Sequence, residues 1–182
     1  TGRPGRCQPY FEMQEWEGVS QLMSMRVGIG YDVHQLTQDR PLIIGGVEIA
    51  WDKGLLGHSD ADVLVHAIMD ALLGAAGLGD IGLHFPDHEE IYRNCSSIAL
   101  LEQVKHKLCH EGWQLVNIDA VIMAQKPKLL SHIADMKKNI SHGLGIDNLC
   151  INIKATTTEG LGFVGREEGI AAQAVVLIDK HA

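Results

Sequence analysis

Three side chains that can bind a metal stand at two places in the sequence. Asp32 and His34 follow an alternating apolar segment, and His66 lies within a segment of helical spacing. In an extended backbone residues i and i+2 point to the same side, so Asp32 and His34 converge. Two histidines and a carboxylate leave a fourth tetrahedral position open, which is typical of catalytic zinc. The alternative is that His34 is a surface-loop residue and His66 a buried histidine with ordinary hydrogen-bond partners.

The segment around His66 is predicted to be a helix that ends at about Ala76, before two glycines. Asp62, His66 and Asp70 stand at i, i+4 and i+8 and so share one helix face. Because ionisable groups beside a core-facing stripe need partners, Asp62 or Asp70 is expected to orient the second ring nitrogen of His66. The alternative for Asp62 is that it is simply an acidic residue in the first turn, where the helix dipole favours a negative charge. Ser59 and Asp62 resemble a capping box that begins at Ser59.

Three polar segments are candidates for anion binding. Adjacent residues such as His58 and Ser59 rarely align a base with a nucleophile, and no Gly-x-Ser-x-Gly sequence is present, so a hydrolase dyad is disfavoured. His58 and Ser59 are interpreted instead as hydrogen-bond donors to an anion at a helix N-terminus. Residues 156–159 (Thr-Thr-Thr-Glu) could do the same, or could be a strand end with a solvated acid. Residues 126–128 (Lys-Pro-Lys) are either a charged turn or a phosphate contact.

The remaining elements set the fold class. Strands are predicted over residues 26–31, 113–124, 150–155 and 170–178, a hairpin over 42–49, helices over 97–110 and 129–142, and a loop without helix over 80–88. In the second of these strands, one face is predicted to carry Val116, Ile118, Ala120 and Ile122. The order predicts a single α+β domain, with a mixed β-sheet and helices on one face. The other face must be buried, which predicts self-association.

Composition limits the partners and the compartment. The chain has 182 residues, 46% of them apolar, and a formal net charge of −8, which disfavours nucleic acid and anionic membranes. Its four cysteines form no Cys-x-x-Cys pair, and no apolar run reaches about 18 residues, so a reduced, cytoplasmic location without a membrane span is expected. Residues 1–24 are expected to be a disordered or artificially added tail or linker. The alternative is a targeting remnant, which would indicate a plastid, or the end of an upstream domain.

Residues 25–182 resemble the 2-C-methyl-D-erythritol 2,4-cyclodiphosphate synthase family, in the order of that family's motifs. The matching segments are Gly30-Tyr31-Asp32-Val33-His34, Gly57-His58-Ser59-Asp60-Ala61-Asp62, His66, Asp80-Ile81-Gly82, Phe85-Pro86-Asp87, Ala124-Gln125-Lys126-Pro127-Lys128, Lys154-Ala155-Thr156-Thr157-Thr158-Glu159 and Gly165-Arg166-Glu167-Glu168-Gly169. Each motif is weak alone, and their combination is specific.

The resemblance implies a lyase of the non-mevalonate isoprenoid pathway. It would convert 4-diphosphocytidyl-2-C-methyl-D-erythritol 2-phosphate into the cyclic 2,4-diphosphate and CMP, by attack of the 2-phosphate on the β-phosphorus. Asp32, His34 and His66 would hold one zinc or other divalent ion per subunit. A second ion, magnesium or manganese, would bind with substrate near Glu159. The family's positions for aligning the diphosphate and stabilising its transition state correspond to His58 and Thr157.

The resemblance also implies a nucleotide-diphosphate substrate site shared between adjacent subunits of a homotrimer. Its residues would be Asp32, Val33, His34, His58, Ser59, Asp80, Ile81, Gly82, Phe85, Pro86, Asp87, His88, Glu89, Ala124, Gln125, Lys126, Pro127, Lys128, Leu129, Leu130, Thr156, Thr157, Thr158, Glu159, Phe163 and Arg166. Phe163 and Arg166 would lie near the threefold axis, beside a cavity for an isoprenoid diphosphate. The alternative for Arg166 is an ion pair with Glu167 or Glu168 across the trimer.

Two other function classes remain open from the residues. A different metal-dependent phosphotransferase or hydrolase would use the same three ligands on another phosphoester. A non-catalytic trimeric module would bind a metal or an isoprenoid diphosphate without turnover. By the resemblance, the loops at residues 80–82 and 85–89 would hold the methylerythritol part, and residues 124–130, with Thr156 and Thr157, would form the cytidine pocket. The cytidine-pocket residues together with the Thr-Thr-Thr-Glu loop favour the cyclase, because a generic metal-binding module does not require them.

Overall fold

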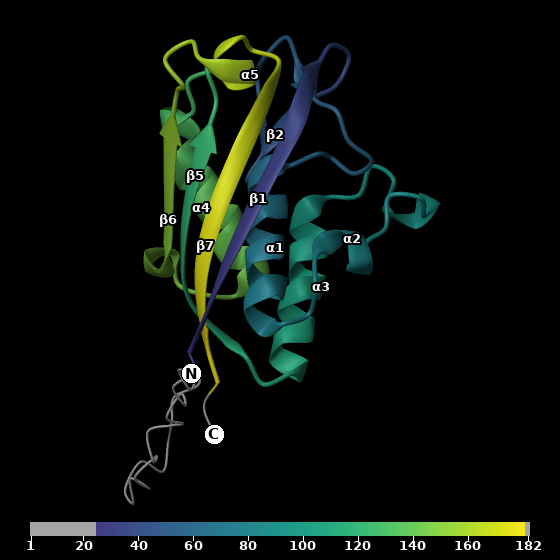
Figure 1. Ribbon diagram of the computed structural model, residues 1–182, viewed down its shortest axis with the longest axis vertical. Helices are drawn as coiled ribbons and strands as arrows, with labels where there is room; N and C mark the ends of the chain where they lie inside the picture. The colour runs from purple at the N-terminus through teal and green to yellow at the C-terminus, as the bar shows by residue number, and fades with distance from the viewer. Residues whose placement is uncertain (1–24, 181–182) are drawn as a thin grey trace, which may run out of the picture.

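β1 (Arg26–Thr37) and β7 (Gly169–Asp179) lie side by side in the middle of a five-stranded sheet (Figure 1). The computed structural model describes residues 25–180, so the tail expected over residues 1–24 lies outside the described residues. The strand order is β4 (Gly54–Leu55), β1, β7, β5 (Gln114–Met123) and β6 (Ile151–Thr156). β5 and β6 are parallel and the other neighbouring pairs are antiparallel, which confirms the mixed sheet.

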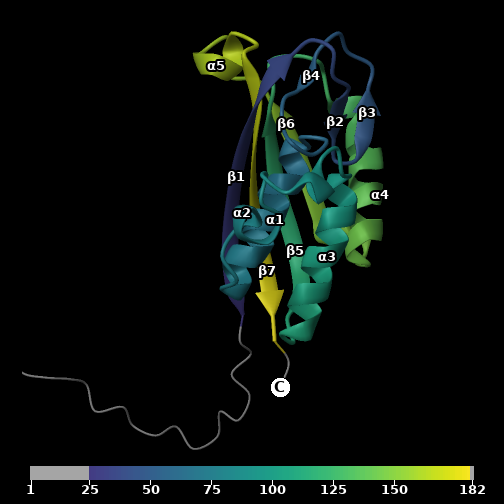
Figure 2. The ribbon, with the colours of Figure 1, turned by 90° about the vertical axis from the view of Figure 1, so that its right-hand side faces the viewer.

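The three long helices lie on one face of this sheet (Figure 2). They are α1 (Val63–Ala76), α3 (Ser97–His110) and α4 (Ile133–Leu144). α1 packs directly on β1 and β7, and its residues are buried except Asp70 and Gly74. α3 packs against α1, and α4 packs against α3 and β6. The α+β architecture predicted from the order of elements is therefore observed.

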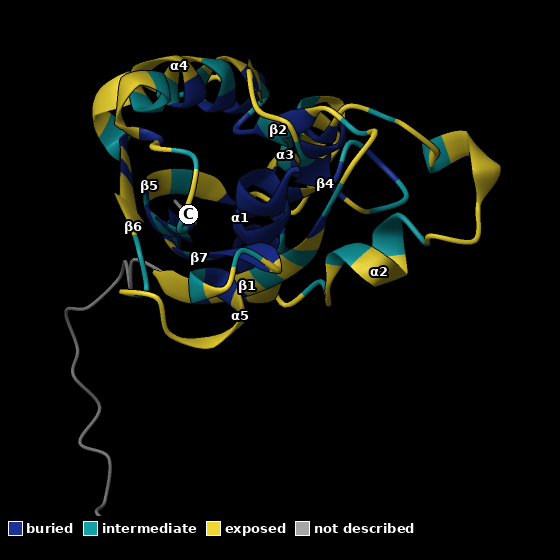
Figure 3. Cartoon of the chain, turned by 90° about the horizontal axis from the view of Figure 1, so that it is seen from above, coloured by how far each residue is buried: buried dark blue, intermediate teal, exposed yellow. Residues whose placement is uncertain are grey.

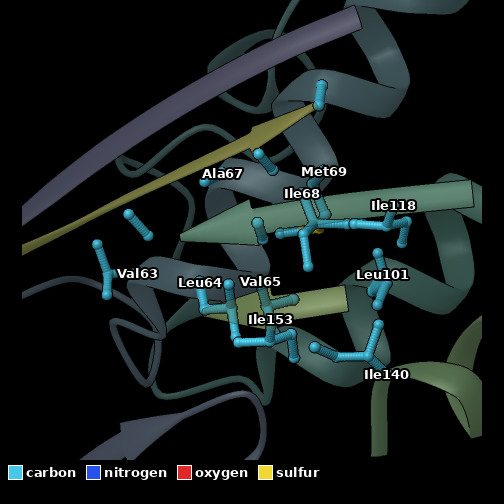
Figure 4. Packing of buried hydrophobic residues seen from close by; sticks show 14 of the residues in the cluster. Val63, Leu64, Val65, Ala67, Ile68, Met69, Leu101, Ile118, Ile140 and Ile153 are labelled. Carbon is cyan, nitrogen blue, oxygen red and sulfur yellow. The ribbon is translucent and has the colours of Figure 1, made fainter. Parts of the chain in front are cut away.

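One apolar core fills the space between the helices and the inner face of the sheet. Ile68 of α1, Leu101 of α3, Ile118 of β5 and Ile140 of α4 belong to it, and each is at most 1% exposed (Figure 4). Burying a side chain of this size contributes about 1.5–3 kcal/mol to the free energy of unfolding. This core holds α1, which carries His66, at a defined place on the sheet.

Two glycines of β1 allow α1 to lie unusually close to the sheet. A Cβ atom at Gly30 would overlap the backbone carbonyl oxygen of Ala67, and one at Gly28 would overlap that of Ala71. Without these side chains the helix backbone can approach the strand directly. Because His66 precedes Ala67, this contact also brings His66 next to the strand residues that follow Gly30.

The opposite face of the sheet is open in the single chain. Val27 and Ile29 of β1 are 68% and 64% exposed, and Val175 of β7, which pairs with Ile29, is 41% exposed. Figure 3 shows exposed and intermediate residues along the outer side of β1, while α1 behind it is buried. The exposed apolar side chains therefore lie on adjacent strands of the same face.

Two predicted boundaries near the site are wrong: the end of β1 and the start of α1. β1 does not end at Tyr31 but continues to Thr37, because β7 pairs with it as far as Gln35. The N-cap of α1 is Asp62 and not Ser59, since the Asp62 side chain accepts a hydrogen bond from the Val65 amide.

The predicted hairpin explains why Asp62 takes the capping position. β2 (Leu42–Ile44) and β3 (Val47–Ile49) form the hairpin, and its turn residues Gly45 and Gly46 both have positive φ. Their amides donate hydrogen bonds of 2.9 Å and 2.6 Å to the two carboxylate oxygens of Asp62. Asp62 therefore joins the hairpin to the start of α1.

Three further differences are local. A short helix, α2 (Ile81–His84), stands where a loop was predicted, because the Asp80 side chain caps it through the Leu83 amide. α4 begins at Ile133, after a 3-10 turn over Leu130–His132, rather than at Leu129, and it ends at Leu144, with Gly145 in the left-handed conformation, rather than at His142. A bulge in β5 leaves Val116 41% exposed and off the inner face.

The other predicted boundaries, for α3, β5, β6 and β7, agree with the structure within one residue at each end. Among residues 25–180, no helix combines the length and the apolar character needed to cross a bilayer.

Candidate active site

β1 and α1 bring Asp32, His34 and His66 into one cluster. Asp32 Oδ2 lies 3.0 Å from His34 Nε2 and 3.0 Å from His66 Nδ1, and these two ring nitrogens are 3.1 Å apart. Asp32 and His34 project from the face of β1 that meets α1, as the i, i+2 spacing predicts. His66 faces them from the start of α1.

The cluster fits a divalent metal ion. Three ligand atoms around a tetrahedral zinc at about 2.0–2.1 Å are about 3.3 Å apart, and the observed edges of 3.0–3.1 Å are close to this. His34 Nδ1 lies 2.8 Å from the carbonyl oxygen of Leu56. The proton therefore belongs on Nδ1, and Nε2 presents its lone pair to the cluster.

In the metal-free cluster the charges favour an ionised Asp32 and a proton on His34, and a metal ion would have to displace that proton. Burial raises the pKa of the Asp32 carboxyl, but hydrogen bonds and charges of His34 and His66 outweigh burial and hold that pKa well below its usual range. Burial lowers the pKa of His34, and the hydrogen bond and charge of Asp32 more than reverse this. A carboxylate that stays ionised at neutral pH is the form that binds a metal.

A pocket of about 540 Å³ opens beside the cluster. Its wall is formed by α2 and the residues that follow it, and Met69, Tyr92 and Leu100 complete it. The predicted site residues that line this pocket are Asp32, His34, His58, Ser59, His66, Ile81, Gly82, Phe85, Pro86, Asp87 and His88. Ile81, Gly82 and residues 85–88 therefore share one pocket with the metal ligands.

His58 and Ser59 do not form a dyad with each other. His58 Nε2 lies 3.0 Å from the carbonyl oxygen of Glu89, which fixes the ring across the pocket wall. Ser59 Oγ lies 3.2 Å from His66 Nε2 and accepts a hydrogen bond of 3.2 Å from the Ala61 amide. This arrangement agrees with the interpretation that neither residue belongs to a serine hydrolase.

The expected carboxylate partners of His66 are not found. Asp62 is engaged by backbone amides at the start of α1, and Asp70 accepts a hydrogen bond of 2.8 Å from the Ile81 amide. The second ring nitrogen of His66 instead faces the hydroxyl groups of Ser59 and Ser97. The predicted pairing with Asp62 is wrong because Asp62 is the N-cap, where its side chain turns back onto the first-turn amides.

A second pocket, of about 430 Å³, lies between β6 and the segment after β5. It is lined by the predicted residues Ala124, Pro127, Lys128, Leu129, Leu130, Thr156 and Thr157, together with Ile133, Ile153, Lys154 and Ala155. The two pockets share no lining residue within the described part of the chain.

The loop after β6 brings Thr157 and Glu159 together. Thr157 Oγ1 donates a hydrogen bond of 2.7 Å to Glu159 Oε1, and Glu159 has a positive φ of 53°. Thr158 Oγ1 donates to the carbonyl oxygen of Leu161 at 2.6 Å, so its side chain serves the turn. Both Thr157 and Glu159 are accessible from solvent.

The other predicted residues lie around these pockets. Val33 is on the open face of the sheet, away from Asp32 and His34, and Asp80 caps α2. Lys126 forms an ion pair of 3.0 Å with Glu167, and Gln125 Oε1 accepts a 3.4 Å hydrogen bond from the Gly160 amide. Phe163 lies in α5 (Gly162–Gly165), and Arg166 directly follows it. The ion pair of Arg166 is with Glu168 of the same chain, at 2.8 Å.

Sequence reasoning missed Ser97, which is fully buried beside His66. The sequence contains no signal for it, because Ser97 and His66 are 31 residues apart and meet only where α3 begins beside α1.

Comparison with known proteins identifies the family. Residues 25–179 match the model of the YgbB family. A 2-C-methyl-D-erythritol 2,4-cyclodiphosphate synthase from Clostridium botulinum (strain Kyoto / Type A2) is 66% identical over 155 residues, which cover 85% of this chain and 100% of the relative.

Solved structures show the same similarity. The bifunctional IspDF from Campylobacter jejuni matches with a TM-score of 0.84 and 47% identity, over 87% of this chain and 43% of that protein. A CDP complex of IspF from Plasmodium falciparum matches with a TM-score of 0.76 and 33% identity, over 87% of this chain and 97% of that one. The chain therefore belongs to the YgbB family, to which it is matched over residues 25–179 and in which its relatives are cyclodiphosphate synthases.

Proposed function

We propose that the chain converts 4-diphosphocytidyl-2-C-methyl-D-erythritol 2-phosphate into 2-C-methyl-D-erythritol 2,4-cyclodiphosphate and CMP. The observation that carries this proposal is the cluster of Asp32, His34 and His66 at the wall of an open pocket, in a chain 66% identical to a synthase of that name. The 2-phosphate attacks the β-phosphorus of the same molecule, and CMP leaves. This reaction belongs to the non-mevalonate route to isoprenoids.

The reaction requires no nucleophile from the protein, because the attacking oxygen is part of the substrate. The chain then contributes orientation and charge stabilisation, as in other phosphoryl transfers. His58 and Ser59 line the pocket, where Ser59 would donate a hydrogen bond to the diphosphate. Because His58 Nε2 donates to the carbonyl oxygen of Glu89, His58 would donate to the diphosphate through Nδ1, as an imidazolium. Thr157, whose hydroxyl donates to Glu159 in the free chain, would turn that hydroxyl to the phosphate oxygens that gain charge in the transition state.

Asp32, His34 and His66 are the proposed metal ligands, with zinc as the proposed ion. Glu159 is the proposed protein contact of a second ion, magnesium or manganese, that arrives with the substrate. When bound, these ions supply Lewis acidity at the phosphate oxygens. The carboxylate of Asp32 and one ring nitrogen of each histidine would hold the first ion, and their mutual distances of 3.0 Å support this proposal.

The two pockets suggest how the substrate is divided. The pocket beside the metal ligands, with Ile81 to His88 on its wall, suits the methylerythritol and phosphate part. The pocket at residues 124–130 and 156–157 suits cytidine, and the CDP bound in the Plasmodium falciparum relative supports a nucleotide-diphosphate ligand. We assign backbone contacts to Val33, Asp80 and Glu89, whose side chains do not line the first pocket.

A homotrimer would join the two pockets. They share no residue within the described chain, so the cytidine pocket of one subunit can complete the metal pocket of its neighbour. The open sheet face, with Val27, Ile29 and Val175, supplies apolar surface for the contact. Phe163 and Arg166 would then lie near the threefold axis, where an isoprenoid diphosphate is the proposed ligand.

The proposed location of the protein is the cytoplasm, or a plastid.

Native mass spectrometry tests the assembly. We expect the mass of three chains, and with added geranyl diphosphate we expect one further ligand mass per trimer. A monomer at micromolar concentration would refute the trimer, while a trimer that takes up no geranyl diphosphate would refute only the cavity ligand.

Phosphorus NMR tests the reaction. The purified protein is incubated with the substrate and magnesium, with and without a chelator, and product signals are followed. We expect CMP and a cyclic diphosphate, both lost on chelation and restored by zinc plus magnesium but not by either ion alone. CDP should slow the reaction by occupying the cytidine pocket.

The two alternative functions give different spectra in the same experiment. CMP with a linear product would indicate a hydrolase that uses the same ligands. Unchanged substrate, with zinc bound to the protein, would leave a binding module as the function.

A further inference from the structure

A chain of hydrogen bonds leads away from the metal cluster on the far side of His66. His66 Nε2, the ring nitrogen that does not face Asp32, lies 2.9 Å from Ser97 Oγ. Ser97 Oγ in turn donates a hydrogen bond to Asp60 Oδ1. Ser97 is fully buried at the start of α3, so its hydroxyl has no access to solvent.

Asp60 is held by backbone groups from two elements. Its Oδ2 accepts a hydrogen bond of 2.9 Å from the Ser97 amide, and its Oδ1 accepts one of 3.2 Å from the Asp62 amide. The Asp60 amide donates to the carbonyl oxygen of Cys95 at 3.1 Å. The carboxylate is thus fixed between the loop before α1 and the start of α3.

The donors and acceptors in this chain have only one consistent assignment. A carboxylate accepts hydrogen bonds, so the hydroxyl proton of Ser97 points to Asp60. The oxygen of Ser97 then offers a lone pair to His66, and His66 Nε2 must carry the proton. For a neutral ring, His66 Nδ1 is left bare, and Nδ1 is the atom 3.0 Å from Asp32 Oδ2 in the metal cluster.

The Asp32 carboxylate favours the opposite tautomer, because it can accept a hydrogen bond from Nδ1. With a proton on Nδ1, His66 would donate to the Asp32 carboxylate at 3.0 Å, and the ring nitrogen would no longer be able to bind a metal. Something must therefore favour Nε2–H over Nδ1–H before the site can accept an ion. The buried Ser97 oxygen, itself oriented by Asp60, is the acceptor that does so.

We infer that Ser97 and Asp60 are positioning residues of the metal site: they keep the proton of His66 on Nε2 and so keep Nδ1 free for the ion. The inference rests on the proposed ligand role of His66. Ser59 Oγ, at 3.2 Å from the same nitrogen, is a secondary acceptor. Its distance is longer, and its lone pairs also receive the Ala61 amide.

The experiment measures two quantities in wild type and Ser97→Ala. Zinc affinity is measured by competition with a chromophoric chelator, and the tautomer of His66 is measured in metal-free protein at alkaline pH by two-bond proton–nitrogen NMR correlations. We expect zinc affinity to fall about 10–100-fold in Ser97→Ala. We also expect the proton of His66 to lie on Nε2 in wild type and to move toward Nδ1 in the variant.

Ser96→Ala is the matched control, because Ser96 is the adjacent, exposed serine and makes no capping hydrogen bond through its side chain. It should keep both the wild-type affinity and the wild-type tautomer. Ser97→Thr, which retains the hydroxyl, should recover most of the affinity.

A wild-type His66 with its proton on Nδ1 would overturn the inference, and that measurement needs no variant to fold. Ser97→Ala with unchanged tautomer and affinity would also overturn it. If wild type binds zinc with the expected tautomer but releases no CMP, the proposed reaction fails and this inference stands.

Discussion

His66→Ala is expected to remove the metal and the activity together. The variant loses one of three ligand atoms, and two remaining ligands do not hold an ion in a fixed position. Loss of charge stabilisation worth several kcal/mol corresponds to a fall in kcat of about 1,000-fold. Zinc content by plasma emission spectrometry and CMP release measured on the same samples check both parts.

His66 is buried, with 8% of its surface exposed, so replacing it by alanine can also lower the stability of the fold. Thermal unfolding separates a missing ligand from a missing structure, and His34→Ala removes a second ligand that is more accessible. His106→Ala, on the exposed side of α3, is the control and should keep both zinc and turnover. Full zinc content and full turnover in folded His66→Ala would show that the ligand assignment is wrong.

Thr157→Val is expected to lower kcat by about 100-fold while the trimer stays intact. Valine keeps the shape of threonine and removes the hydroxyl, so the variant loses one hydrogen-bond donor to the transition state. Thr157 is solvent-accessible, and its hydroxyl contacts Glu159 rather than the core, so little stability depends on it. Steady-state kinetics of CMP release, with KM measured separately, check the prediction.

Thr157→Ser provides the matched comparison, because serine retains the hydroxyl without the methyl group. It should keep most of the activity that valine loses. An unchanged rate in Thr157→Val would reduce Thr157 to a residue of the loop structure. A raised KM with unchanged kcat would instead assign Thr157 to substrate binding in the ground state.

Several parts of the site could be predicted from the sequence because they depend on local spacing and on residue type. The i, i+2 spacing of Asp32 and His34 places both on one side of any strand, so the two residues converge even though the strand continues to Thr37. Helical spacing predicts α1, and the chemistry of a carboxylate with two imidazoles indicates a divalent metal. The glycines at 28 and 30 suit a close approach of a helix, but the sequence does not identify the helix.

The tertiary structure alone decided which groups surround His66. Its spacing from Asp62 and Asp70 suggested two carboxylate partners, but Asp62 caps the helix and binds the hairpin. The actual partner, Ser97, comes from α3, and Asp60 fixes it. Contacts of this kind depend on how helices pack across the core. That packing is set by the summed burial of many apolar side chains, and no local pattern encodes it.

The same limit applies to the two pockets. Sequence motifs predict which residues belong to the site, but in the structure those that line a pocket are divided between two separate pockets of one chain. The order of strands in the sheet, with β1 beside β7 and β6 at the edge, places them apart. Strand order follows from pairing between segments distant in sequence, whereas residue type and spacing are local properties. The sequence by itself therefore determined the chemistry of the site, and the tertiary structure decided its geometry.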